Sequence, residues 1–190
     1  PFDNPKIRQA MFYALNQEDF LKAVHGDAKY YKLCKALFIC DTPLATTKGT
    51  DGLLTSNAKK AQELLKEAGY DGTPVVLMHS TDLKVLTNLA PVAKSLMEKA
   101  GFKVDMQSMD WQTLVARRVK KDPPNAGGWN AFLTAWVTAD VSRRVRSISS
   151  ASRAISGASA RARSTSPKPG SLFMRFLAAC SARVGLLVRW

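Results

Sequence analysis

The sequence predicts an α/β fold in which flanking helices cover a mainly parallel β-sheet. Between residues 74 and 137, three stretches with the pattern of strands alternate with two stretches of helical periodicity. This order requires crossover connections, which are right-handed in nearly all proteins and leave the strands parallel. Helical patterns also fill much of residues 4–69, and a chain of this size buries enough apolar surface to form a core.

Two helices are expected at the start of the chain. Asn4 is a suitable N-cap and Pro5 a suitable first residue for a helix whose apolar positions recur every three or four residues up to Leu15. A second, shorter helix is expected over residues 20–24 and ends near Gly26.

A surface loop and a third helix follow. Residues 41–56 are rich in Thr, Gly and Asp, which predicts the loop. Asn57 then caps a helix that ends before Gly69. The buried stripe of this helix is expected to comprise Ala61, Leu64, Leu65 and Ala68.

The first strand and the helix after it are predicted within residues 74–100. Residues 74–79 are almost continuously apolar, as in a strand that is covered on both faces. Residues 82–100 predict a helix in which Pro91 marks a kink or the true start. Ser80 or Thr81 is expected to cap this helix, and the strand-end His79 is expected to be structural and not catalytic.

Another strand, helix and strand complete the alternation. Residues 102–107 alternate between apolar and polar side chains, so this strand is expected to have one wetter face. Residues 111–121 predict a helix and residues 129–137 the third strand. The apolar side of this last helix is expected to comprise Leu114, Val115 and Val119.

Charge divides the chain after Asp140. All fifteen Asp and Glu lie in residues 1–140 with eighteen Lys and Arg, whereas residues 141–190 hold nine Arg, one Lys, eleven Ser and no acid. The tail therefore carries +10 of the net charge of +13. We expect residues 1–140 to be the folded part and residues 141–190 to be mostly disordered or a loose helix.

Several kinds of chemistry lack their sequence motifs. The chain has no glycine-rich nucleotide-binding loop, no H-E-x-x-H motif and no G-x-S-x-G motif. Cys34 and Cys40 are too far apart for a zinc knuckle, and only His25 and His79 are present to complete a metal site. We therefore expect no catalytic residue, metal or cofactor. By spacing alone, the two cysteines are equally consistent with a local disulfide and with two free thiols.

Aromatic and acidic residues gather toward the end of the third predicted strand. Trp129, Phe132, Trp136 and Asp140 lie on this strand or just beyond it, and ligands of α/β sheets gather at the carboxyl ends of strands. A tryptophan face suits a peptide or small organic ligand, and a carboxylate pairs with an ammonium group. The alternative is a core tryptophan and a loop aspartate.

Five segments of residues 1–140 form an ordered series. Residues 1–17 read PFDNPKIRQAMFYALNQ, residues 58–70 read AKKAQELLKEAGY and residues 101–105 read GFKVD. Residues 109–118 and 129–136 complete the series. In order and spacing they resemble the family 5 extracytoplasmic solute-binding proteins of ABC importers, whose corresponding segments include PFDNxxVRQAxxYAIDR, AKxLLxEAGY and AGIxVxL.

The resemblance implies a partial type II periplasmic-binding-protein lobe, the first part of the second ligand-binding lobe. It implies a periplasmic receptor that binds a peptide or similar small solute and delivers it to ABC permease subunits, with no specific nucleic-acid partner. Trp136 and Asp140 resemble the family's GW-x-x-D site, with a spacing one residue longer, in which the Asp receives the α-amino group of a peptide. Trp129 is a third ligand-binding candidate. The resemblance also implies a disulfide between Cys34 and Cys40.

The two ends of the chain carry expectations of their own. Residues 1–5 contain neither an initiator Met nor the start of a signal peptide, so we expect a fragment of a longer protein. After Asp140 the family pattern gives way to Arg-, Ser- and Ala-rich sequence, and we hypothesise out-of-frame translation of a GC-rich gene. Translating the other two frames tests this, and the hypothesis fails if neither yields acid-containing, family-like sequence.

The alternative function rests on the basic tail. Arg-rich segments bind nucleic-acid phosphates without sequence specificity. Eight apolar residues are also spaced for a basic amphipathic helix on an anionic membrane: Leu172, Phe173, Phe176, Leu177, Cys180, Val184, Leu187 and Val188. Binding that is lost on deletion of residues 141–190, and confined to one sequence or lipid, is the result that favours this alternative.

Overall fold

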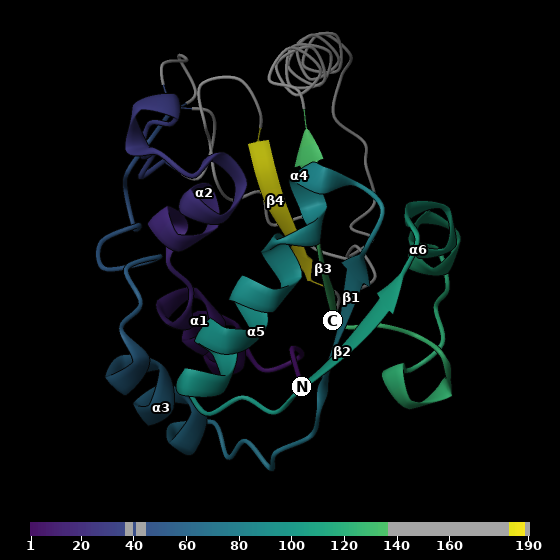
Figure 1. Ribbon diagram of the computed structural model, residues 1–190. Coiled ribbons are helices and arrows are strands. Elements are labelled where there is room, and N and C mark those ends of the chain that lie inside the picture. Colours follow the sequence, from purple (N-terminus) through teal and green to yellow (C-terminus); the bar gives the residue numbers. More distant parts are fainter. Residues whose placement is uncertain (37–39, 41–44, 137–182, 189–190) are drawn as a thin grey trace, which may run out of the picture.

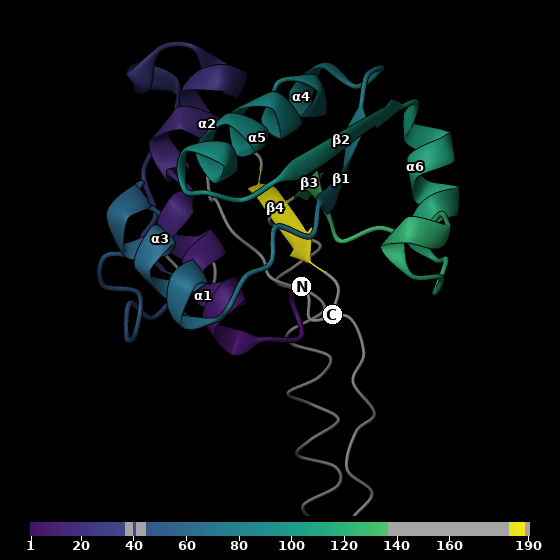
Figure 2. The same ribbon diagram turned by 90° about the horizontal axis from the view of Figure 1, so that it is seen from below.

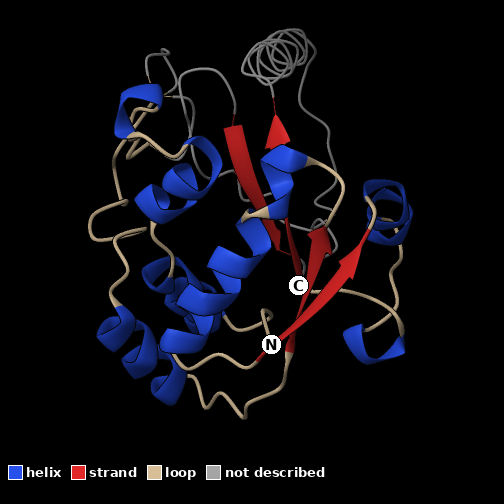
Figure 3. Ribbon diagram, in the orientation of Figure 1, coloured by secondary structure: helices blue, strands red, loops and turns tan. Residues whose placement is uncertain are grey.

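A sheet with helices on both of its faces organises the chain (Figures 1 and 3). The computed structural model describes residues 1–36, 40, 45–136 and 183–188. The strands are β1 (Val75–Ser80), β2 (Val104–Met109), β3 (Ala131–Trp136) and β4 (Arg183–Val188). Their order in the sheet is β2-β1-β3-β4; the first three are parallel, and β4 is antiparallel to β3. The predicted α/β class and parallel sheet are therefore confirmed.

The central strand β1 is buried along its whole length, as its apolar sequence predicts. Val75 and Leu77 belong to the larger core, which includes residues of α1 (Pro5–Ala14), α3 (Ala58–Glu67) and α5 (Leu89–Lys99). Val76 and Met78 belong to a smaller core with Leu114 of α6 (Trp111–Arg118). Successive residues of a strand point to opposite faces of the sheet, so β1 joins the two cores. Figure 2 shows α6 on the opposite side of the strands from α1 and α3.

Four short helices precede the sheet: α1 (Pro5–Ala14), α2 (Gln17–His25), η1 (Ala28–Tyr30) and α3 (Ala58–Glu67). The side chains of Asn4 and Asn57 cap α1 and α3, as predicted. The helix α2 begins three residues earlier than the sequence predicts, because Asn16 accepts a hydrogen bond from the backbone N–H of Glu18 and caps it.

Four further helical segments flank the strands: α4 (Lys84–Thr87), α5 (Leu89–Lys99), α6 (Trp111–Arg118) and η2 (Pro124–Ala126). The predicted helix over residues 82–100 is interrupted at Asn88, and Pro91 lies in the first turn of α5. Proline fits there because the first-turn N–H groups have no partner within the helix.

Two local predictions about these helices are wrong. The N-cap position of α4 is Leu83, and no side chain caps this helix. The hydroxyl of Ser80 donates instead to Asp82. Val119, predicted to lie on the apolar side of α6, is 70% exposed because the helix ends at Arg118.

The basic tail contributes a strand to the sheet. Residues 183–188 were expected to belong to a disordered segment or loose helix, but they form β4, which pairs with β3 from Ala131↔Val188 to Trp136↔Arg183. The sequence Arg-Val-Gly-Leu-Leu-Val has β-branched and large apolar residues. Without β4, this edge of β3 would have unpaired N–H and C=O groups. The rest of the tail, and with it residues 172–180 of the predicted amphipathic helix, lies outside the described residues.

Among the described residues, no helix combines the length and the apolar character needed to cross a membrane.

Candidate functional site

The strand order of the sheet reverses beside β1. From β1 the chain passes through α4 and α5 to β2 on one side, and then through α6 to β3 on the other side. In open α/β sheets, ligands bind outside the carboxyl ends of the strands where the strand order reverses in this way. Here β1 ends at Ser80 and β3 at Trp136. We call residues 80–82, 109–111 and 136 the carboxyl edge.

Backbone and side-chain bonds tie the ends of β1 and β2 together at the carboxyl edge. The carboxylate Oδ1 of Asp82 accepts hydrogen bonds from the Ser80 hydroxyl and from the Trp111 N–H, each at 2.9 Å. The N–H of Thr81 donates to the carbonyl oxygen of Met109 at 3.0 Å. Asp82 therefore joins the end of β1 to the first residue of α6.

Asp110, at the same edge, is occupied as the N-cap of α6. Its two carboxylate oxygens accept from the backbone N–H of Thr113 at 2.9 Å and from the Thr113 hydroxyl at 2.6 Å. These hydrogen bonds from Thr113 favour the ionised carboxylate and lower the pKa of Asp110 from its ordinary value.

His79 has a structural role, as the sequence predicts. The imidazole Nε2 lies 2.8 Å from the carbonyl oxygen of Thr87, and Nδ1 lies 3.0 Å from the hydroxyl oxygen of Ser108. Because a carbonyl oxygen only accepts, Nε2 carries the proton of that hydrogen bond. Both ring nitrogens are bonded within the protein, and the side chain is buried, so the ring links β1, β2 and α4.

The structure separates the two predicted tryptophans. Trp129 precedes β3 and lies in the smaller core, 3% exposed, with its indole N–H donating to the carbonyl oxygen of Arg118 at 3.1 Å. Trp136 is the last residue of β3, so its backbone lies at the carboxyl edge. The two residues are therefore at opposite ends of the strand. Asp140 lies outside the described residues.

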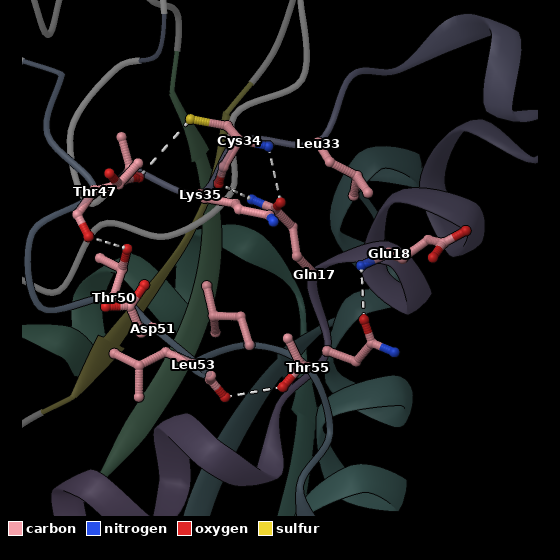
Figure 4. Close-up of a pocket in the computed structure, with 14 residues that line it drawn as sticks. Gln17, Glu18, Leu33, Cys34, Lys35, Thr47, Thr50, Asp51, Leu53 and Thr55 are labelled. Atoms are coloured by element: carbon pink, nitrogen blue, oxygen red, sulfur yellow. Dashed lines mark hydrogen bonds between the residues drawn. The ribbon is translucent and has the colours of Figure 1, made fainter.

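A disulfide joins Cys34 to Cys40, which confirms the pairing implied by the family resemblance. Gln17 holds this loop from the first turn of α2. Its amide donates to the Cys34 carbonyl oxygen at 2.8 Å and accepts from the Cys34 N–H at 2.9 Å (Figure 4). The side chains of Gln17 and Cys34 are buried, with residue exposures of 6% and 3%. Sequence reasoning missed Gln17, because a single polar residue in a helix gives no sign of such a partner.

A pocket of about 440 Å³ lies between this loop and residues 47–55 (Figure 4). Leu54, which lines this pocket, and Ser56, just beyond its lining, have left-handed backbone conformations with φ of 59° and 57°. Backbone hydrogen bonds hold them: the Gln17 N–H donates to Leu54 and the Ser56 N–H donates to Leu15. The surrounding contacts thus maintain a conformation that is costly for residues other than glycine.

The described residues contain no group of three or more His, Cys, Asp or Glu side chains placed to hold a metal ion. What the carboxyl edge provides is a set of backbone groups, the hydrogen-bonded carboxylates of Asp82 and Asp110, and a half-buried tryptophan, Trp111. Such an arrangement suits non-covalent binding of a small polar solute.

Comparison with known proteins identifies the class. Residues 1–151 match the family described as "Bacterial extracellular solute-binding proteins, family 5 Middle". The chain is thus an extracellular solute-binding protein by class. It belongs to family 5 of these proteins, since the match covers more than half of the chain. This match ends at residue 151, whereas the resemblance read from the sequence ends at Asp140.

Two curated relatives give the family match more detail. The chain is 33% identical over 136 residues to the "Probable peptide ABC transporter periplasmic-binding protein y4tO" of Sinorhizobium fredii, covering 70% of this chain and 25% of the relative. It is 30% identical over 138 residues to the "Glutathione-binding protein GsiB" of Salmonella choleraesuis, covering 72% of this chain and 26% of the relative. The chain therefore spans about a quarter of the length of these relatives.

A solved structure shares the fold. The ABC transporter substrate-binding protein CtaP of Listeria monocytogenes superposes with a TM-score of 0.55 at 23% identity, over 62% of this chain and 24% of that one. At this level of identity the likeness supports the architecture alone.

Proposed function

We propose that this chain is part of the substrate-binding component of an ABC importer for peptides or a similar small solute. The observation that carries the proposal is the reversal of strand order beside β1 in a family 5 chain, because ligands of open α/β sheets bind at the carboxyl ends of the strands at such a reversal. The names of the two relatives, a probable peptide-binding protein and a glutathione-binding protein, support a short peptide as the solute. They also support a periplasmic location and membrane permease subunits as partners.

The proposed assignment places residues 1–140 in the second of two ligand-binding lobes. In it Trp136 and Asp140 contact the solute, and Trp129 supports β3 from the smaller core at the other end of the strand. Residues 141–190 are proposed to be read out of frame. A lobe without its partner offers only part of the contacts and no closure over the solute, so binding by this chain alone is expected to be weak.

Nuclear magnetic resonance titration of the ¹⁵N-labelled chain with dialanine or glutathione tests this proposal. We expect amide shifts confined to the carboxyl edge, with a dissociation constant of roughly 1 mM or weaker, near −4 kcal/mol. Shifts confined to other surfaces, or no shifts with either peptide, contradict the proposed solute site. Binding at micromolar concentration contradicts the assignment of this chain to one incomplete lobe.

A further inference from the structure

We propose that Asp82 makes this carboxyl edge selective for solutes with a cationic side chain. The inference rests on the proposed function, because it assigns a specificity-determining residue to the same solute site. It concerns a different part of that site from Trp136 and Asp140. The roles of those two residues are implied by the family resemblance, whereas the role of Asp82 is inferred from the strand order and the hydrogen bonds of this structure.

Asp82 follows the strand beside which the strand order reverses. It lies two residues beyond the end of β1, the strand from which the chain crosses to β2 on one side and later returns to β3 on the other. Ligands of open α/β sheets bind outside the carboxyl ends of the strands where the strand order reverses, and the bond from the Trp111 N–H holds Asp82 at this edge on the β2 side of β1. Asp82 is exposed, so a solute at the carboxyl edge has access to its carboxylate.

Two hydrogen bonds fix the orientation of the Asp82 carboxylate. Both bonds within the protein, from the Ser80 hydroxyl and from the Trp111 N–H, end on the same oxygen, Oδ1. They hold the carboxylate in one orientation and leave Oδ2 to accept from a solute. A carboxylate held in place loses less conformational entropy on binding than a freely rotating one.

A second carboxylate, that of Asp110, lies at the same edge. Asp110 and Asp82 each accept two hydrogen bonds, but those of Asp110 fall one on each oxygen and those of Asp82 both fall on Oδ1, so Oδ2 of Asp82 faces a solute without a competing bond from these partners. Lys84 is the nearest basic residue to Asp82 in the sequence, and within the described part of the chain no ion pair joins it to Asp82. None of the ion pairs among the described residues includes Asp82, so its carboxylate is left to attract an ammonium or guanidinium group.

Two tripeptides that differ in a single charge provide the probe: alanyl-lysyl-alanine, and alanyl-norleucyl-alanine, which has a methyl group in place of the ammonium. The full chain of 190 residues is titrated with each, and the amide shifts of the carboxyl edge report the affinities. We expect the lysyl peptide to bind about threefold more tightly, the size typical of an exposed charge pair. Equal affinity for the two peptides overturns the inference but leaves the proposed function intact. If neither peptide shifts these amides, both fail.

The variant Asp82→Asn separates charge from structure. Its side-chain oxygen still accepts from Ser80 and Trp111, so the fold and the affinity for the norleucyl peptide should be unchanged while the preference for the lysyl peptide disappears. The matched control Ser80→Ala removes one bond to Asp82 but keeps its charge, and should retain the preference. An Asp82→Asn variant that still prefers the lysyl peptide shows that another residue reads the charge, and overturns the inference.

Discussion

The buried hydrogen bonds between Gln17 and Cys34 allow a quantitative prediction. Replacing Gln17 with Ala leaves the N–H and the C=O of Cys34 without their partners, at present 2.9 Å and 2.8 Å away. An unsatisfied buried polar group costs about 1–3 kcal/mol. The two groups together would cost about 2–6 kcal/mol. The adjoining pocket of about 440 Å³ can admit water to them, so the lower half of this range applies. We expect Gln17→Ala to lower the free energy of unfolding by about 2–4 kcal/mol.

Urea unfolding followed by tryptophan fluorescence measures this change. With a slope of about 2 kcal/mol per molar urea, the midpoint should fall by roughly 1–2 M. The matched control is Gln62→Ala, because the Gln62 amide makes a single hydrogen bond, to the Lys99 carbonyl, on the exposed face of α3. This control should lose no more than about 0.5 kcal/mol. Equal effects of the two substitutions would show that the pairing of Gln17 with Cys34 does not stabilise the fold.

Three further predictions concern the disulfide, the N-cap of α6 and the added strand. Replacing Cys34 and Cys40 together by Ser should cost roughly 2 kcal/mol by the loop-entropy relation, measured by urea unfolding; a stability equal to that of the parent chain contradicts it. The pKa of Asp110 is lowered in the folded chain by its bonds from Thr113, so its stabilising contribution is present above the unfolded pKa and is lost as the pH falls through the folded value. Asp110→Asn should therefore reduce the acid-side fall in stability, and an unchanged acid unfolding profile refutes this. Deleting residues 183–188 should expose the edge of β3 and promote association, which light scattering detects; an unchanged monomer at equal concentration argues against a protective role for β4.

The sequence predicts most of the regular structure because its signals are local. The asparagine caps of α1 and α3 and the apolar run of β1 depend on a few neighbouring residues, and all three are where the sequence places them. The failures are also local: the apolar periodicity past Arg118 predicts a buried Val119, but no element covers that position once α6 ends.

The candidate site was predictable only in outline. The sequence indicates that a ligand should lie beyond the third strand, and the structure places the end of β3 beside β1 at the reversal of strand order. The sequence does not reveal that Trp129 is buried at the opposite end of that strand, or that Asp82 is held by Ser80 and Trp111. These facts depend on contacts between segments up to about thirty residues apart, which no local pattern encodes.

By itself the sequence determined the α/β class, the family 5 membership and the residues able to form a disulfide, because these follow from composition, periodicity and ordered motifs. Only the tertiary structure decided the strand order, the pairing of β4 with β3, and the two bonds by which Gln17 holds the disulfide loop. The physical reason is that a helix or strand preference arises within a few residues, whereas the partner of an exposed edge or a buried amide is chosen by the packing of the whole chain.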